Sequence, residues 1–212
     1  MPDIYFDLDG TLTDPFEGIS KSIVFALQRL GEPEPNNETL LKCIGPPLLA
    51  SFESLVGEGR AREALTHYRE RFGDVGWREN AAYPGIRGIL HALRESGRTL
   101  YVATSKPGVF AERILTHFEL DEFFSGIFGS ELDGRRTNKI DLLEHALSVN
   151  ASIEAVMIGD REHDVIGALH NNMDIIGVTY GYGSEEELKS AGAQRIANSP
   201  GELGALLMEI QS

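Results

Sequence analysis

The chain has 212 residues, of which 42% are hydrophobic and 25% charged, a size and composition typical of a globular protein. Its formal net charge of −14 argues against a nucleic acid polymer or an anionic membrane as a partner, and an anionic substrate would need a metal cation or local lysines. The single Cys43 excludes an internal disulfide, and the sequence shows neither a signal peptide nor the ~18–20 apolar residues of a membrane span, so we expect a cytoplasmic protein.

The first predicted element is a buried strand at residues 4–6, which ends before Gly10. Asp7 and Asp9 follow it, at the end of the strand where ligands bind in open parallel sheets. Because strand side chains alternate, both carboxylates point to the same side. Such a pair is costly without a cation or a shared proton, so it suits a metal ion or a nucleophile beside an acid/base. An acidic turn without function is the alternative.

The next block of the chain is predicted to be helical. Asp14 is a predicted N-cap with Pro15 at the first helical position, and apolar residues at helical spacing follow as far as Gly31. Further helices are predicted at residues 38–44, 47–56 and 60–72. We therefore predict a separate helical domain at residues 16–81, inserted between the two segments of a core domain, residues 1–15 and 82–212.

From residue 83 onward, predicted strands and helices alternate. The predicted strands are residues 99–103, 123–128, 154–158, 174–178 and 195–196. The predicted helices are residues 86–97, 109–118, 139–147, 165–169, 185–191 and 200–210. This alternation is typical of a parallel sheet with both faces covered, so the predicted fold class is α/β, a doubly wound, Rossmann-like parallel sheet with an inserted α-helical domain.

Further polar residues lie at the ends of predicted strands. Thr104 and Ser105 end one strand ahead of a helix, where a hydroxyl and backbone N–H groups make an anion site. Lys139 begins a helix after another strand, and Asp160 and Asp164 follow a fully apolar strand. Oxygen ligands of this kind select a hard cation, so we expect Mg²⁺.

These residues resemble a known set of motifs. Four stretches of the sequence are similar, in order and spacing, to the four motifs of the haloacid dehalogenase (HAD) superfamily, and together they extend over nearly the whole chain. They are residues 7–11 (Asp-Leu-Asp-Gly-Thr), Thr104, Lys139 and residues 159–164. The inserted helical domain resembles the superfamily's helical cap. Residues 9–14, 44–48 and 159–161 resemble the branch of phosphoglycolate phosphatases and 5′-nucleotidases.

The resemblance implies an enzyme that hydrolyses a small phosphorylated metabolite, with a nucleoside 5′-monophosphate slightly favoured over phosphoglycolate. Asp7 would be the nucleophile that forms an aspartyl-phosphate, and Asp9 the general acid and then the base. Thr104, with Ser105, would bind the phosphoryl oxygens, and Lys139 would neutralise their charge and that of Asp7.

The same resemblance implies the metal ligands. Mg²⁺ would be held by Asp7, the Asp9 main-chain carbonyl and Asp160, with Asp164 as a further ligand or a residue beside the ligands. The cation and Lys139 would then form a local cationic pocket in an acidic protein.

Other functions stay open at this point. A phosphosugar mutase of the same fold also keeps the second aspartate, although Thr11 is more typical of the phosphatases. A phospho-accepting signalling protein has a comparable acidic Mg²⁺ site, but it lacks the helical insertion and an acid like Asp9. Lys106 is interpreted either as positive charge at the mouth of the site or as a solvent-facing side chain. Arg161 either contacts substrate or pairs with a carboxylate, and residues 181–183 are interpreted as a plain loop.

Overall fold

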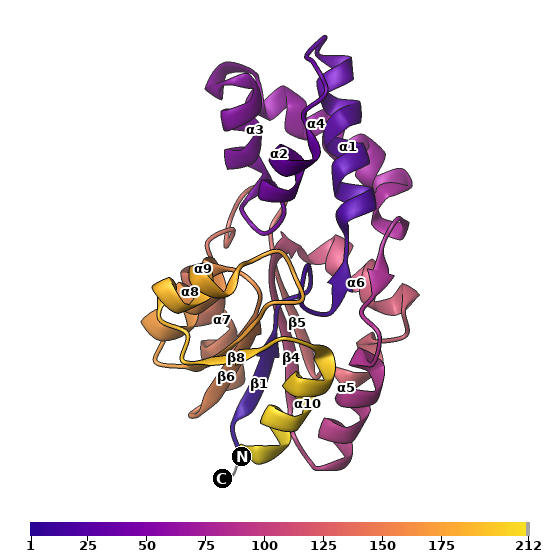
Figure 1. Ribbon diagram of the computed structural model, residues 1–212. Coiled ribbons are helices and arrows are strands. Elements are labelled where there is room, and N and C mark those ends of the chain that lie inside the picture. Colours follow the sequence, from indigo (N-terminus) through magenta and orange to yellow (C-terminus); the bar gives the residue numbers. More distant parts are fainter. Residues whose placement is uncertain (211–212) are drawn as a thin grey trace. The chain divides into compact units, whose positions relative to one another are not determined.

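The computed structural model describes residues 1–210 and divides the chain into two compact units (Figure 1). One unit joins Met1–Asp14 to the segment that starts at Ala82, and the other is Pro15–Ala81. The boundary predicted after residue 15 lies one residue away from this division, because Pro15 belongs to the helical unit. The predicted core segment 82–212 includes Gln211 and Ser212, which lie outside the described residues.

The larger unit is built on a parallel sheet of six strands, which confirms the predicted α/β fold class. The strands are β1 (Asp3–Phe6), β4 (Leu100–Pro107), β5 (Gly126–Ser130), β6 (Ala155–Gly159), β7 (Asp174–Val178) and β8 (Arg195–Ala197). Their order is β5-β4-β1-β6-β7-β8, and every neighbouring pair is parallel. The strand β1 therefore lies between β4 and β6, so the carboxyl ends of these three strands are adjacent.

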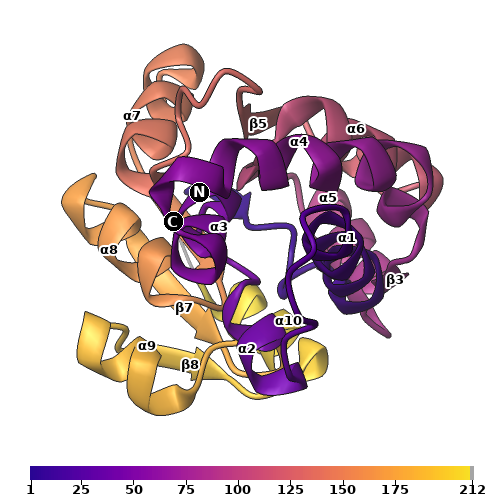
Figure 2. The same cartoon turned by 90° about the horizontal axis from the view of Figure 1, so that it is seen from above.

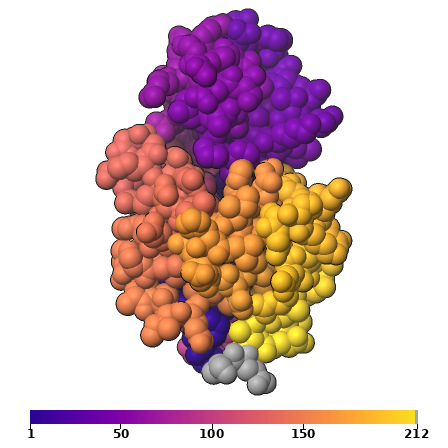
Figure 3. Space-filling view, turned by 90° about the vertical axis from the view of Figure 1, so that its left-hand side faces the viewer, coloured from indigo at the N-terminus to yellow at the C-terminus, as the bar shows by residue number. Residues whose placement is uncertain are grey.

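Helices cover both faces of this sheet (Figures 1 and 2). The helices are α5 (Ile86–Glu95), α6 (Gly108–His117), α7 (Lys139–Asn150), α8 (Glu162–His170), α9 (Glu185–Ala191) and α10 (Pro200–Glu209). On one face α7, α8 and α9 bury a cluster that includes Tyr5, Leu143, Met157 and Leu188, and Figure 3 shows the surface that these helices form. Helices α5, α6 and α10 lie against the other face.

Side-chain caps fix where several of these helices begin. The Asn138 side chain accepts a hydrogen bond from the Ile140 backbone N–H at 2.8 Å, which makes Lys139 the first residue of α7. Ser184 and Ser199 cap α9 and α10 in the same way, through backbone N–H groups three residues later. The cap on α7 therefore sets the position from which Lys139 extends.

Several predicted boundaries are wrong. The strand predicted at residues 99–103 continues to Pro107, and the helix predicted at residues 165–169 already begins at Glu162. Asp14 does not cap the first helix, because α1 begins at Phe16 and Asp14 lies in the short strand β2. The strand predicted at residues 123–128 begins later, since residues 121–123 form a 3₁₀ turn that buries Phe123. Pairing with β4 starts only where the Ser125 N–H donates to the Leu100 carbonyl at 2.8 Å.

The helical unit contains α1 (Phe16–Arg29), α2 (Asn37–Lys42), α3 (Leu48–Val56) and α4 (Glu58–Asp74), followed by the 3₁₀ turn η1 (Gly76–Arg78). Its core includes Phe52, Tyr68 and Phe72, and the Tyr68 and Phe72 rings stack with centroids 5.3 Å apart. The chain crosses between the units in β2 (Thr13–Asp14) and β3 (Ala81–Ala82), which form a two-stranded sheet.

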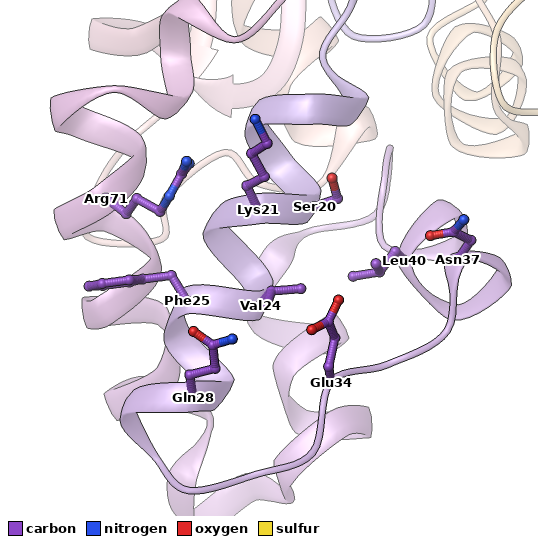
Figure 4. Close-up of a pocket in the computed structure, with 9 residues that line it drawn as sticks. All are labelled: Ser20, Lys21, Val24, Phe25, Gln28, Glu34, Asn37, Leu40 and Arg71. Atoms are coloured by element: carbon purple, nitrogen blue, oxygen red, sulfur yellow. The ribbon is translucent and has the colours of Figure 1, made fainter.

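A pocket of about 350 Å³ opens within the helical unit (Figure 4). Its lining residues are Ser20, Lys21, Val24, Phe25, Gln28, Glu34, Asn37, Leu40 and Arg71. Its two cations, Lys21 and Arg71, both pair with Glu79, at 3.2 and 2.7 Å, and Lys21 also pairs with Glu17. Across residues 1–210, no helix combines the length and the apolar character that a membrane span requires.

Candidate active site

Three buried carboxylates meet at the carboxyl end of the sheet. Asp7 directly follows β1, and its backbone N–H donates to the Ile158 carbonyl of β6 at 2.8 Å. Asp160 directly follows β6, and Asp164 lies in the first turn of α8. Each of the three carboxylates offers an oxygen, and these oxygens lie within 4.8 Å of one another. This is the end of the sheet at which the sequence predicts a site.

Three glycines allow the backbone to approach Asp160 closely. Gly10 has a φ of +84°, which favours glycine, and a Cβ there would lie 2.1 Å from Asp160 Oδ2. A Cβ on Gly181 would lie 2.5 Å from the same oxygen, and one on Gly183 would lie 1.8 Å from the Asp160 carbonyl oxygen. A larger residue at any of these positions would displace Asp160.

Lys139 extends from the start of α7 into this cluster and is only 4% exposed. Its Nζ lies 3.0 Å from Asp7 Oδ1, 2.7 Å from Asp164 Oδ1 and 2.9 Å from the Ala103 carbonyl, so three acceptors surround the ammonium group. Burial alone would lower the pKa of Lys139, but the Asp164 and Asp7 carboxylates outweigh burial and raise this pKa above its usual value. Lys139 is therefore a cation at neutral pH.

Asp9 carries the fourth buried carboxylate and is paired with a second lysine. The Nζ atom of Lys106 lies 2.6 Å from Asp9 Oδ2, and both side chains are largely buried. The Lys106 backbone N–H donates to Thr104 Oγ1 at 3.2 Å, at the end of β4. Burial raises the pKa of Asp9, and the Lys106 charge opposes this rise. Of the two interpretations of Lys106, the solvent-facing one is wrong.

The donor set fits one divalent cation. The four carboxylates and two ammonium groups carry a formal charge of −2, which one such ion would neutralise. Asp160 Oδ1 is buried and has no hydrogen-bond partner among residues 1–210. Burial, with the charges of Asp164 and Asp7, raises the pKa of Asp160 well above its usual range. A cation held by Asp7, Asp160 and Asp164 would compensate these costs, and carboxylate oxygens suit a hard cation.

The loop at residues 179–183 supports the cluster, a role that the interpretation as a plain loop missed. The Tyr182 backbone N–H donates to Asp160 Oδ2 at 2.8 Å, and its hydroxyl donates to Asp14 Oδ1. The Tyr180 hydroxyl donates to the Thr11 carbonyl at 3.0 Å. The spacing of the glycines was the only available signal, because it places small residues on both sides of Tyr182.

The remaining predicted residues have clear positions. Thr104 is buried in the second half of β4, just before its bulge, whereas Ser105 is half-buried. The Ser105 carbonyl accepts a hydrogen bond from Ser130 Oγ at 2.7 Å. Arg161 pairs with Glu187 at 2.8 Å, which is the carboxylate pairing that the sequence left open. The structure thus brings together Asp7, Asp9, Thr104, Lys139, Asp160 and Asp164.

Comparison with known proteins assigns the family. Residues 4–178 match the sequence profile described as haloacid dehalogenase-like hydrolase. The chain belongs to the haloacid dehalogenase-like hydrolases. A 5′-nucleotidase from Pseudomonas aeruginosa is 54% identical to this HAD hydrolase over 89% of the chain and 87% of its own length.

Further relatives bear on the activity. A predicted phosphatase from Clostridium acetobutylicum has a crystal structure with a TM-score of 0.95 and 46% identity, over 99% of this chain and all of that one. A protein from Mycobacterium tuberculosis named tyrosine-protein kinase PtkA is 41% identical over 85% of this chain, which spans 62% of that protein. Phosphoglycolate phosphatases match at 27–30% identity. The family match, the 5′-nucleotidase and the phosphoglycolate phosphatases show that the chain is a HAD-type phosphatase.

Proposed function

We propose that this phosphatase is a Mg²⁺-dependent nucleoside 5′-monophosphate phosphohydrolase that works through an aspartyl-phosphate. One observation carries the proposal: the buried Asp7 carboxylate is held by Lys139 at 3.0 Å, and Asp9 follows two residues later at the same strand end. A carboxylate that an ammonium group fixes in this way is a competent nucleophile, and Asp9 supplies the proton transfer that the leaving alcohol requires.

In the first step Asp7 attacks the phosphorus atom, and the bond from phosphorus to the ester oxygen breaks. Asp9 gives its proton to that oxygen, so the alcohol leaves neutral. The Thr104 hydroxyl binds the phosphoryl oxygens, with Ser105 beside it, and the Lys139 ammonium offsets their charge. Because phosphoryl transfer depends mainly on position and charge stabilisation, these residues account for the step.

In the second step a water molecule attacks the aspartyl-phosphate. Asp9 accepts the proton from this water, the bond between phosphorus and Asp7 breaks, and inorganic phosphate leaves with Asp9 protonated again. The carboxylates of Asp7, Asp160 and Asp164 and the Asp9 carbonyl would hold Mg²⁺, which supplies charge neutralisation at the phosphoryl oxygens.

The substrate class is inferred from relatives. The 54% identity to a 5′-nucleotidase favours a nucleoside 5′-monophosphate, and the phosphoglycolate phosphatases, at 27–30% identity, make phosphoglycolate the second candidate. We infer that the helical unit 15–81 acts as a cap that excludes water and sets this choice. Identical amide exchange in this unit, with and without Mg²⁺ and a phosphate mimic, would contradict the role as a cap.

The test is a phosphate-release assay over nucleoside monophosphates, phosphoglycolate and phosphosugars, with Mg²⁺ or with EDTA. We expect release from nucleoside 5′-monophosphates that is lost in EDTA and in Asp7→Asn. Full activity of Asp7→Asn would contradict the assignment of the nucleophile. No release from any substrate, with a stable phosphoprotein, would instead favour a mutase or a phospho-accepting signalling protein.

A further inference from the structure

A second buried lysine in the site has no role in the mechanism above. Lys106 lies two residues beyond Thr104, at the carboxyl end of β4. Thr104 pairs with Gly129 of β5 while Pro107 pairs with Ser130, so the strand accommodates two extra residues in a bulge. Bulges beside active sites re-aim side chains, and here the Lys106 side chain is only 5% exposed.

Lys106 holds Asp9 by one of its two carboxylate oxygens. Its Nζ is 2.6 Å from Asp9 Oδ2, whereas Asp9 Oδ1 is buried without a hydrogen-bond partner in the described part of the chain. The two lysines thus pair with different carboxylates. The Lys139 ammonium contacts Asp7 and Asp164, and the Lys106 ammonium contacts Asp9. The two oxygens of Asp9 are therefore not equivalent.

We propose that Lys106 is a positioning residue that holds Asp9 by Oδ2 and so assigns proton transfer to Oδ1. An ammonium group can donate to Oδ2 whether Asp9 is a carboxylate or an acid protonated on Oδ1, because Oδ2 accepts in both states. The same contact therefore serves when Asp9 gives a proton to the leaving oxygen and when it takes one from water. The hydrogen bond from the Lys106 backbone N–H to Thr104 Oγ1 fixes this arrangement relative to the hydroxyl that would bind the phosphate.

This inference rests on the proposed function, and it predicts a difference between substrates in Lys106→Met. Hydrolysis of a nucleoside 5′-monophosphate needs Asp9 in both steps, so kcat should fall about 10²-fold with a nearly unchanged KM. With p-nitrophenyl phosphate the leaving group departs without an acid, and only attack by water needs Asp9. The variant should then release a burst of p-nitrophenolate equal to the enzyme concentration, followed by slow turnover.

The matched control is Lys189→Met, since Lys189 lies on α9, is 59% exposed and pairs only with Glu185 in the part that the structure describes. Unchanged kinetics in Lys106→Met would overturn the proposal. A raised KM with kcat retained would assign Lys106 to substrate binding instead, and equal losses on both substrates without a burst would assign it to charge stabilisation. Wild-type protein that releases no phosphate from any substrate would refute the proposed function itself.

A double-mutant comparison separates positioning from folding. In an Asp9→Asn background, Lys106→Met should cause no further loss of kcat, because Lys106 acts through Asp9. The double variant also removes both members of the buried pair, so it leaves no uncompensated charge and should fold even if Lys106→Met alone does not. A further loss of tenfold or more in the double variant would contradict the proposal.

Discussion

The substitution Asp160→Asn should stabilise the metal-free protein and abolish its response to Mg²⁺. Two carboxylate charges whose oxygens lie within 4.8 Å of each other repel by about 3 kcal/mol at an effective dielectric constant of about 20. Asp160 has two such neighbours, Asp7 and Asp164, and Lys139 offsets part of this repulsion. The asparagine keeps an oxygen to accept the Tyr182 N–H and loses the charge. We therefore expect a net gain of about 2 kcal/mol, or about 4–8 °C in Tm.

The assay is thermal unfolding followed by circular dichroism, in EDTA and then over a range of Mg²⁺ concentrations. Wild-type protein should gain stability as Mg²⁺ is added, whereas the Tm of Asp160→Asn should start higher and stay constant. The control is Asp174→Asn, because Asp174 is 72% exposed and its substitution should change stability by less than about 0.5 kcal/mol. The reasoning would be refuted if Asp160→Asn had a lower Tm than wild type in EDTA, or if its Tm rose with Mg²⁺ as much as that of the wild type.

Three further predictions concern stability. In EDTA, Lys139→Met should lose about 3–5 kcal/mol in urea unfolding because its two carboxylate partners stay buried without a cation, and an unchanged midpoint would contradict the buried pairs. Gly183→Ala should displace Asp160, cost about 1–3 kcal/mol and raise the Mg²⁺ concentration needed for activity, whereas Gly59→Ala, with open space around its Cβ, should not. Hydrogen bonds from Arg71 lower the pKa of Glu79, so Glu79→Gln should lose about 1 kcal/mol of stability at pH 7. This loss relative to wild type should vanish as the pH falls below about 4.3, the pKa in the unfolded chain, and through the lower pKa in the folded protein. A loss that persists in acid would exclude this ion pair as its source.

The position of the site was predictable because it depends on local pattern. Apolar runs that end in a polar residue identify Asp7, Thr104 and Asp160 as residues at the carboxyl ends of strands. Their convergence follows from the strand order, in which β1 lies between β4 and β6. That order depends on contacts between segments far apart in the chain, and no local pattern in the sequence encodes it.

The contacts that complete the site were not predictable in the same way. Period-two alternation places Lys106 on the same side as Thr104, but the choice between solvent and Asp9 depends on the bulge in β4 and on the distance to another strand. Tyr182 supports Asp160 through its backbone N–H, a group that every residue except proline carries. Its role follows from the close approach of two chain segments and not from the identity of its side chain.

The net charge of −14 does not decide which ligands the site can bind. Charges on exposed side chains are screened by salt over about 8 Å, whereas buried charges act on each other through a medium that screens them far less. Near the proposed nucleophile, the field is therefore dominated by the six buried charged groups of the site: Asp7, Asp9, Lys106, Lys139, Asp160 and Asp164. Their formal charge of −2 would repel a phosphate dianion. One divalent cation would cancel this charge, and Lys139 and the hydroxyl of Thr104 would then attract the phosphoryl group. An acidic protein can thus bind an anionic substrate, provided that the cation is bound before the substrate or together with it.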